Sequence, residues 1–193
     1  MNNTKRSDKI IPNRGSTRLC SVVLPVWMLF FMPSVWLIAL PINLVINSVV
    51  LLITLATLAE NRGEAGYKPW GDWLRAIVPV WIFGFISDLV AAGFLLFWGM
   101  GPTLLMGDLT TFGAWWGPNV AEPITENPFG SIFSVLFVLL SIGLGGLLKY
   151  FLNKNMSLRL TKSLDVPEIK RAALALAVIT APWTMLLPSE WFW

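Results

Sequence analysis

Residues 74–99 read LRAIVPVWIFGFISDLVAAGFLLFWG, an apolar stretch with one acidic residue, Asp88, near its middle. About 20 apolar residues in a helix, at ~1.5 Å rise per residue, cross a hydrocarbon core roughly 30 Å thick. The stretch is therefore long enough to span a membrane. An ionised carboxylate at that depth is costly unless it is protonated, paired or facing a polar cavity. Asp88 is thus the residue that the sequence first marks for a function.

The composition of the whole chain also indicates a membrane protein. Hydrophobic residues make up 55% of the 193 residues and charged residues only 13%, whereas about a quarter of a soluble domain is charged. The chain contains no histidine, which excludes haem ligation by histidine, the usual zinc sites and a histidine general base. The single Cys20 excludes an internal disulfide. We therefore expect neither a metal nor a cofactor.

Five apolar segments predict one all-α domain of five transmembrane helices, residues 19–193. Residues 19–59 contain no charged residue, and this run is too long for one span and sufficient for two. Pro33 and Pro41 favour a turn between these two spans, either exposed or re-entrant over residues 33–43. The predicted spans cover residues 19–36, 41–59, 74–99, 128–151 and 169–187.

Capping signals mark where three of these helices begin. Asp72 stands at an N-cap position before the third span. Asn127 followed by Pro128 gives the fourth span an N-cap and a first-turn proline. Asp165 and Glu168 have the spacing of a capping pair at the head of the fifth span.

The connection between the third and fourth spans, residues 101–127, is rich in Gly and Pro and contains no Lys or Arg. Its length without helix signals indicates either a structured cap over the membrane surface or a mobile loop. The adjacent Trp115 and Trp116 suit the membrane interface, and an aromatic platform for a substrate is the sharper alternative.

The basic residues of the chain are distributed asymmetrically. With five spans, one side of the membrane holds residues 1–18, 60–75 and 149–171, which carry five, three and six basic residues, all 14 in the chain. By the positive-inside rule this side is cytoplasmic. We therefore expect a basic cytoplasmic arm at residues 1–18, a cytoplasmic N-terminus, an external C-terminus and a location in the plasma membrane of a prokaryote.

Asp88 has small residues beside it on its own helix face, because Gly84 and Ala92 lie four positions away on either side. The second span presents a polar stripe, formed by Asn43, Asn47, Thr54 and Thr57. We predict that Asp88 contacts Asn47 or Thr54. In one interpretation these groups satisfy one another with a protonated Asp88 and hold the helices together. In the other, Asp88 binds a proton, a cation or a ligand.

Two further features predict contacts. Ser141 and Gly145 form a small-xxx-small pair that favours close helix packing, within the chain or between subunits. The segment 149–171 is the most basic, and we expect it to contact anionic lipid headgroups or a cytoplasmic partner. Its basic residues are Lys149, Lys154, Arg159, Lys162, Lys170 and Arg171.

The sequence offers little support for an enzyme. A membrane aspartyl protease needs two facing carboxylates, and only Asp88 lies within a predicted span. Our first hypothesis is a non-enzymatic subunit of a homo- or hetero-oligomeric membrane assembly. Its expected partners are the lipid bilayer and either copies of itself or other membrane proteins, and not nucleic acid. The alternative is a transport or ion-translocating component in which Asp88, supported by Asn47 and Thr54, titrates or binds the solute.

Overall fold

The computed structural model describes residues 33–63, 67–106 and 111–188, and this part of the chain is helical without a strand. Four of the described helices are long and apolar enough to cross a membrane. These candidate spans are Ala39–Asn61, Trp70–Gly99, Ile132–Leu160 and Val166–Leu186. The all-α class is therefore confirmed. Most of the predicted span at residues 19–36 and the arm at 1–18 lie outside the described residues.

Helix α1 (Pro33–Asn61) continues through the region where we predicted a turn. The turn at residues 33–43 is therefore wrong. Pro33 is the first residue of the helix, where its missing N–H leaves no hydrogen bond unmade. Pro41 lies inside the helix and removes a single backbone hydrogen bond, a defect that apolar helices tolerate. The predicted second span, 41–59, forms the rest of α1.

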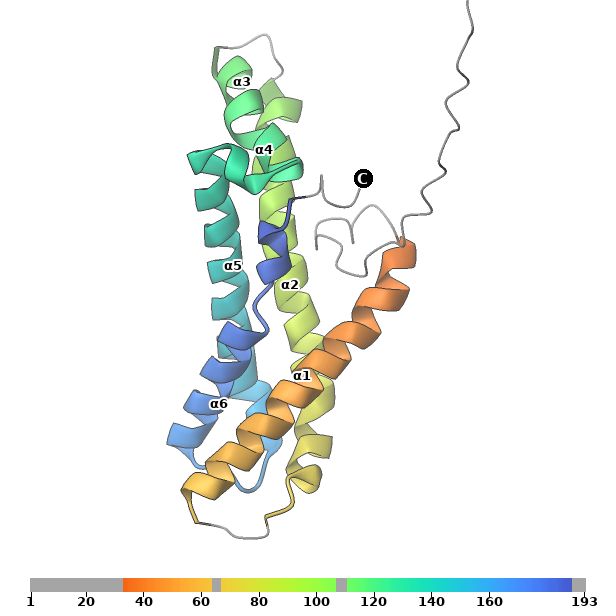
Figure 1. The fold of residues 1–193 in the computed structure, drawn as a ribbon, viewed down its shortest axis with the longest axis vertical. Coiled ribbons are helices and arrows are strands. Elements are labelled where there is room, and N and C mark those ends of the chain that lie inside the picture. Colours follow the sequence, from red (N-terminus) through yellow and green to blue (C-terminus); the bar gives the residue numbers. More distant parts are fainter. Residues whose placement is uncertain (1–32, 64–66, 107–110, 189–193) are drawn as a thin grey trace, which may run out of the picture.

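Two long antiparallel helices form the centre of the bundle (Figure 1). Helix α2 (Trp70–Met106) contains the predicted span 74–99 and extends beyond both of its ends. Helix α5 (Ile132–Leu152) continues through a π-helical turn, η4 (Asn153–Ser157), and a short 3-10 helix, η5 (Leu158–Leu160). The candidate span, Ile132–Leu160, therefore extends nine residues beyond the C-terminal end of the predicted span 128–151.

The last candidate span is broken. Helix α6 (Val166–Ile179) ends in the middle of the predicted span 169–187, and a 3-10 helix, η6 (Trp183–Leu186), follows after three residues. In Figure 1, α6 lies beside the lower half of α5, and η6 follows it, also in contact with α5.

The predicted capping residues lie at helix starts. Asn127 caps the 3-10 helix η3 (Pro128–Gly130), since its side chain accepts a hydrogen bond from the Phe129 N–H at 3.1 Å. The cap of α5 itself is Ser131, four residues later. At α6, the Asp165 N–H donates to the Glu168 carboxylate at 3.0 Å, as the predicted capping pair requires.

The connection between α2 and α5 is a helical cap on one end of the bundle, here called the cap end. The described part of this connection consists of α3 (Thr111–Trp116), a π-helical turn η2 (Gly117–Ala121) and α4 (Glu122–Thr125). Trp116 anchors it: the side chain is 7% exposed, and its ring lies 6.3 Å from that of Trp98 and 5.6 Å from that of Phe137. The structured-cap alternative therefore describes this connection better than a mobile loop.

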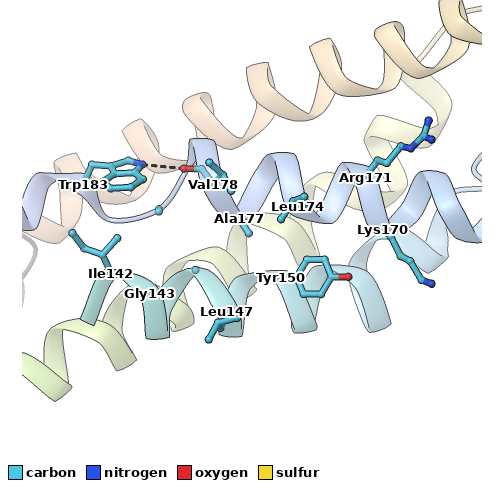
Figure 2. Close-up of a pocket in the computed structure, with 12 residues that line it drawn as sticks. Ile142, Gly143, Leu147, Tyr150, Lys170, Arg171, Leu174, Ala177, Val178 and Trp183 are labelled. Atoms are coloured by element: carbon cyan, nitrogen blue, oxygen red, sulfur yellow. Dashed lines mark hydrogen bonds between the residues drawn. The ribbon is translucent and has the colours of Figure 1, made fainter. Parts of the chain in front are cut away.

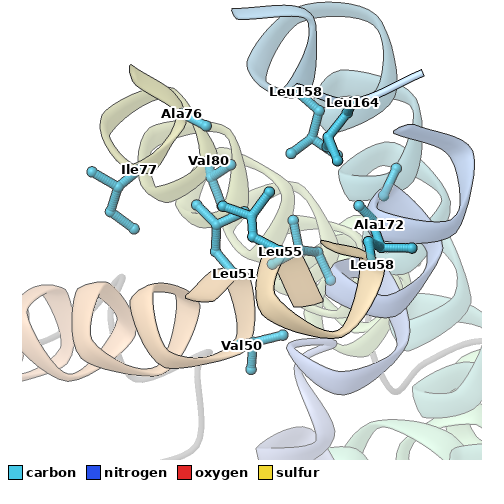
Figure 3. Close-up of a cluster of buried hydrophobic side chains, with 12 residues drawn as sticks. Val50, Leu51, Leu55, Leu58, Ala76, Ile77, Val80, Leu158, Leu164 and Ala172 are labelled. Carbon is cyan, nitrogen blue, oxygen red and sulfur yellow. The ribbon is translucent and has the colours of Figure 1, made fainter. Parts of the chain in front are cut away.

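At the opposite end, here called the basic end, α1 ends and α2 and α6 begin. A cluster of buried apolar side chains joins these helices to η5 (Figure 3). Its members are Val50, Leu51, Leu55, Leu58, Ala76, Ile77, Val80, Leu158, Leu164, Ala172, Ala173 and Leu176. Arg62, just after α1, donates to Glu168 of α6 at 2.5 Å and links the same elements at the surface.

Helix α1 leaves the bundle toward its N-terminal end, as Figure 1 shows. The Trp81 indole N–H of α2 donates to the Leu40 carbonyl at 3.1 Å. Beyond this contact, Leu37 is 79% exposed. Among the described residues, α1 therefore packs on the other helices at the basic end and diverges from them toward the cap end.

Candidate functional site

The candidate site is a buried ion pair between α2 and α5. The Lys149 ammonium lies 3.0 Å from Asp88 Oδ1, and the two side chains are 0% and 9% exposed. The Asn43 amide of α1 donates to Asp88 Oδ2 at 3.1 Å. Lys149 also donates to the backbone carbonyl of Thr180, just after α6. All four candidate spans therefore meet at one pair of charges.

The break in α6 supplies the carbonyl that Lys149 uses. In a continuous helix the Thr180 carbonyl would accept from a backbone N–H four residues later, and here it accepts from the Lys149 ammonium instead. Pro182 has no N–H to donate to the Val178 carbonyl, and the Trp183 indole N–H fills this role at 2.9 Å (Figure 2). The residues after α6 thus leave one carbonyl for Lys149 and satisfy another themselves.

Small residues make room for the pair. A Cβ built on Gly84 would lie 3.5 Å from the Asn47 side chain and 3.8 Å from Lys149 Cε, so α1 and α5 both approach α2 at this glycine. Ala92, four residues beyond Asp88, is fully buried. Gly84 and Ala92 therefore lie in helix contacts, as we predicted for the groove around Asp88.

The predicted partners of Asp88 on α1 are only partly correct. Asn43 contacts the carboxylate, whereas Asn47 donates to the Asn43 carbonyl at 2.8 Å and also to the Asn43 side chain. Thr54 donates to the Val50 carbonyl of its own helix at 2.7 Å. The predicted contact from Asp88 to Asn47 or Thr54 is therefore replaced by the contact to Asn43, one turn earlier in the polar stripe.

Lys149 lies where we did not predict it. We grouped it with the basic residues that contact lipid headgroups or a partner, but its side chain is fully buried. Lys149 lies in the last turn of α5, but the candidate span continues through η4 and η5 to Leu160, so the lysine is an interior residue of this span. The cation at Asp88 also means that a protonated carboxyl is not needed to explain this buried acid.

A polar stripe continues from Lys149 toward the basic end. Asn153 and Ser157 follow at intervals of four residues, and both are fully buried. Their side-chain nitrogen and oxygen atoms have no hydrogen-bond partner among the residues that the structure describes, and the same is true of Asn47 Oδ1. Buried polar atoms are normally satisfied, often by internal water. These three residues therefore carry buried hydrogen-bonding capacity that the described side chains leave unused.

Toward the cap end from the ion pair, the same face of α5 carries small and apolar residues in place of polar ones. Ser141 Oγ donates to the Ala91 carbonyl at 2.6 Å, and a Cβ on Gly145 would lie 3.0 Å from Ala91 Cβ. The predicted close packing at Ser141 and Gly145 thus occurs within the chain, between α5 and α2. Apolar side chains surround this contact, namely Ala91, Ala92, Leu95, Val138 and Ile142.

A second polar cluster closes the basic end. Asp72 is buried and accepts from the Tyr67 hydroxyl at 2.8 Å, the Arg75 guanidinium at 3.1 Å and the Lys162 N–H at 2.9 Å. Burial is the main cause that raises the pKa of Tyr67, and Asp72 adds to it, whereas the hydrogen bond with Ser163 lowers it. The prediction of Asp72 as an N-cap is wrong, because α2 begins at Trp70 and Asp72 lies inside its first turn. There it joins the start of α2 to the loop before α6.

The other basic residues of segment 149–171 lie at the surface. Arg159, Lys162, Lys170 and Arg171 are exposed, and the Lys154 ammonium lies 5.5 Å from the centre of the Tyr150 ring. Among the described residues, no three His, Cys, Asp or Glu side chains lie close enough together to hold a metal ion.

Comparison with known proteins adds no family to this description. No protein-family model, no curated protein and no solved structure matches the chain. The function must therefore be argued from the ion pair and its surroundings.

Proposed function

We propose that the chain is a proton-translocating component of a membrane, with the Asp88–Lys149 pair as its proton site. The observation that carries the proposal is the pair itself, two opposite charges buried among apolar helices. Unpaired charges are costly there, and intramembrane ionisable groups typically mark transport pathways. This is the transport alternative from the sequence analysis. Lys149 and Asn43 contact Asp88 in the structure, where we had expected Asn47 and Thr54 to do so.

The chemistry of the pair suits proton transfer. A proton passed from the Lys149 ammonium to the Asp88 carboxylate converts the ion pair into a neutral amine and a neutral carboxylic acid. Removal from water penalises the ion pair and not the neutral pair, which brings the two states closer in free energy. Release of the proton from Asp88 and uptake of another by Lys149 would complete one transfer.

The surroundings of the pair support access from one side. Asn153 and Ser157 extend from Lys149 toward the basic end with unpartnered polar atoms, and they lie in the π-helical turn η4. Turns of this kind are frequent at functional sites. Toward the cap end the pair is covered by the apolar contact of α2 and α5. The break after α6, Thr180 to Pro182, is the natural hinge for opening that side.

The proposal includes an orientation. The positive-inside rule puts the basic end in the cytoplasm, which gives a cytoplasmic N-terminus, an external C-terminus and five spans if residues 19–36 also cross. A plasma membrane of a prokaryote is the location we propose. Protons would then reach Lys149 from the cytoplasm.

The test is proton flux in liposomes that contain the purified chain, measured with an internal pH-sensitive dye after a pH jump. We expect Asp88→Asn to reduce the flux to that of empty liposomes. We expect Asn153→Leu to reduce it as well while raising stability, because an apolar side chain replaces unpartnered buried polar atoms. Ser141→Ala is the matched control on the same face toward the cap end, and it should keep the flux.

Equal flux from Asn153→Leu and from the unchanged chain would rule out the path along η4. Unchanged flux in a folded Asp88→Asn variant would refute the assignment of Asp88 and Lys149 as the proton site. Correct folding is checked for each variant by its elution as a single species in size-exclusion chromatography.

A second proposal is that the chain also works as a subunit of a larger membrane assembly. The departure of α1 from the bundle supports it, because Leu37 and Val45 are 79% and 61% exposed on a helix with few contacts toward the cap end. The small-residue pair of α5 does not support it, since Ser141 and Gly145 pack on α2. Purification from native membranes in mild detergent, followed by mass spectrometry and light scattering, distinguishes a foreign partner, copies of the chain and a monomer.

A further inference from the structure

A groove runs along the outer surface of the bundle between α5 and α6, away from the ion pair. Its volume is about 560 Å³. Figure 2 shows α5 and α6 as its two walls, with Trp183 at one end and Lys170 and Arg171 at the other. The walls between these ends are apolar or small: Ile142, Gly143, Gly146, Leu147, Leu174, Ala177, Val178 and Ala181.

Two glycines of α5 create the space. A Cβ built on Gly143 would meet no atom within 4 Å, and one on Gly146 would touch only the Ala177 carbonyl, at 3.7 Å. A side chain added at Gly143 would therefore begin in open space on the groove wall. The groove therefore exists because α5 has glycine instead of a larger residue at positions 143 and 146, where it lies beside α6.

Basic and polar groups gather at one end of the groove. Lys170 and Arg171 are exposed, and neither forms an ion pair or hydrogen bond with the described residues. The Tyr150 hydroxyl points toward the same end in Figure 2, and the Lys154 ammonium lies 5.5 Å from the Tyr150 ring centre. Three cations and a phenol thus lie near the point where the apolar walls end.

The length of the groove suits one leaflet of a bilayer. Ile142 and Tyr150 are eight residues apart on α5, which corresponds to about 12 Å of helix. Half of a hydrocarbon core that is roughly 30 Å thick is about 15 Å. An acyl chain that enters from the basic end would therefore lie in the groove over most of the depth of its leaflet.

We propose that this groove binds one anionic phospholipid of the leaflet at the basic end. One acyl chain lies along Gly143 and Gly146, and the phosphate lies among Lys154, Lys170 and Arg171. Charge complementarity selects this occupant, because basic pockets between spanning helices attract acidic headgroups, whereas a zwitterionic lipid offers the same chains without the net charge. The proposal is independent of proton flux through the Asp88–Lys149 pair.

The test uses the purified full chain in detergent, stripped of lipid and titrated with phosphatidylglycerol or with phosphatidylcholine of the same acyl chains. Native mass spectrometry counts the bound lipids. We expect one phosphatidylglycerol to remain at a concentration where phosphatidylcholine does not. The double variant Lys170→Gln/Arg171→Gln should weaken its retention about tenfold or more, given the attraction of each basic residue for anionic lipid.

Matched variants separate a site from general attraction. Lys68→Gln/Lys162→Gln removes the same charge from exposed residues outside the groove and should leave retention unchanged. Gly143→Phe fills the groove and should abolish it. Gly93→Phe adds the same ring at a glycine of α2 whose Cβ would also meet no atom within 4 Å, and it should retain the lipid.

A phosphatidylglycerol that carries a photoreactive group in its acyl chain identifies the contact directly. We expect crosslinks in peptides that contain residues 142–150 and 174–181. Four outcomes would each overturn the proposal. The lipid could crosslink equally to the outer face of α2, or the matched control variants could lose the lipid as the groove variants do. Free glycerol phosphate could bind as tightly as the lipid, or a copurifying protein could protect the groove.

Discussion

At the scale of single residues, Lys149 determines the net charge of the protein interior around Asp88. A buried acid alone implies either a protonated group or an open polar cavity, whereas a buried pair implies a net charge of zero. The pair also uses both carboxylate oxygens, since Asn43 donates to the second one. The buried side-chain polar atoms without partners among the described residues belong to Asn153 and Ser157, on the basic-end side of Lys149 in α5 and η4, and to Asn47 of α1.

The pair predicts a specific pattern of stability. Asp88→Ala and Lys149→Met should each lower the free energy of unfolding by about 3–5 kcal/mol, because each leaves one buried group without its partner. The double variant should lose less than the sum of the two, since it leaves no unpaired charge. Denaturant titration in detergent micelles, followed by helical circular dichroism, measures all three.

Additive losses in that titration would mean that the two side chains are not coupled in the folded protein. As a control, Lys162→Met changes an exposed lysine at the basic end and should alter the free energy of unfolding by less than about 0.5 kcal/mol.

The sequence identified Asp88 because one acid in a long apolar run is conspicuous. It did not identify Lys149, because a lysine close to the end of the predicted span 128–151 is most simply assigned to the membrane surface. A signal was nevertheless present. Serine or glycine recurs every four residues at Ser141 and Gly145 before Lys149, and polar residues continue the spacing afterwards, which puts the lysine on the packed face.

At the scale of elements, the contact between α2 and α5 depends on the absence of a side chain at Gly145. A Cβ there would lie 3.0 Å from Ala91 Cβ and 3.4 Å from the Ser87 carbonyl. Gly143, two residues earlier, faces open space. The same helix therefore carries one glycine required for packing and one that is not.

This difference predicts opposite outcomes for the same substitution. Gly145→Val should lower the free energy of unfolding by about 1–3 kcal/mol, because the added methyl groups force α2 and α5 apart. Gly143→Val should leave it unchanged or raise it, since valine is a better helix former than glycine. Thermal unfolding in detergent compares the two variants. Equal destabilisation would show that α2 and α5 do not pack as described.

The sequence predicted a helix boundary correctly where a capping pair marks it. It failed at prolines, because a proline can either end a helix or lie within one. Asp165 and Glu168 correctly indicated the start of α6. Pro33 and Pro41 suggested a turn, but a proline at a helix start or inside a long apolar helix is compatible with helix. The break before Pro182 was missed, because the apolar run continues to Pro188 and hydropathy alone does not register an interrupted helix.

At the scale of the whole molecule, the distribution of charge separates two ends. The described arginines and lysines, apart from the buried Lys149, lie at the basic end, and Glu122 and Glu126 lie at the cap end. This asymmetry is visible in the sequence without any structure. What the sequence did not reveal is that every candidate span contributes one group to a single buried point.

The proposed orientation of the chain predicts which residues label from outside. In a Cys20→Ser background, Glu122→Cys should react with a membrane-impermeant maleimide in intact cells, and Lys162→Cys should react only after the membrane is opened. Both positions are exposed in the structure, so burial does not account for a difference. Gel shift of the labelled chain gives the readout. Labelling of Lys162→Cys in intact cells would invert or refute the topology.

The separation of Asp88 and Lys149 by 61 positions in the sequence also has a consequence for how the protein is made. If both helices span the membrane as we propose, α2 enters it before α5 has been translated, and until then its carboxylate has no cation to meet. The first helices are therefore incomplete products that the insertion machinery must retain or shield. We therefore expect loss of either charge to impair the biogenesis of the protein as well as the stability of its folded state.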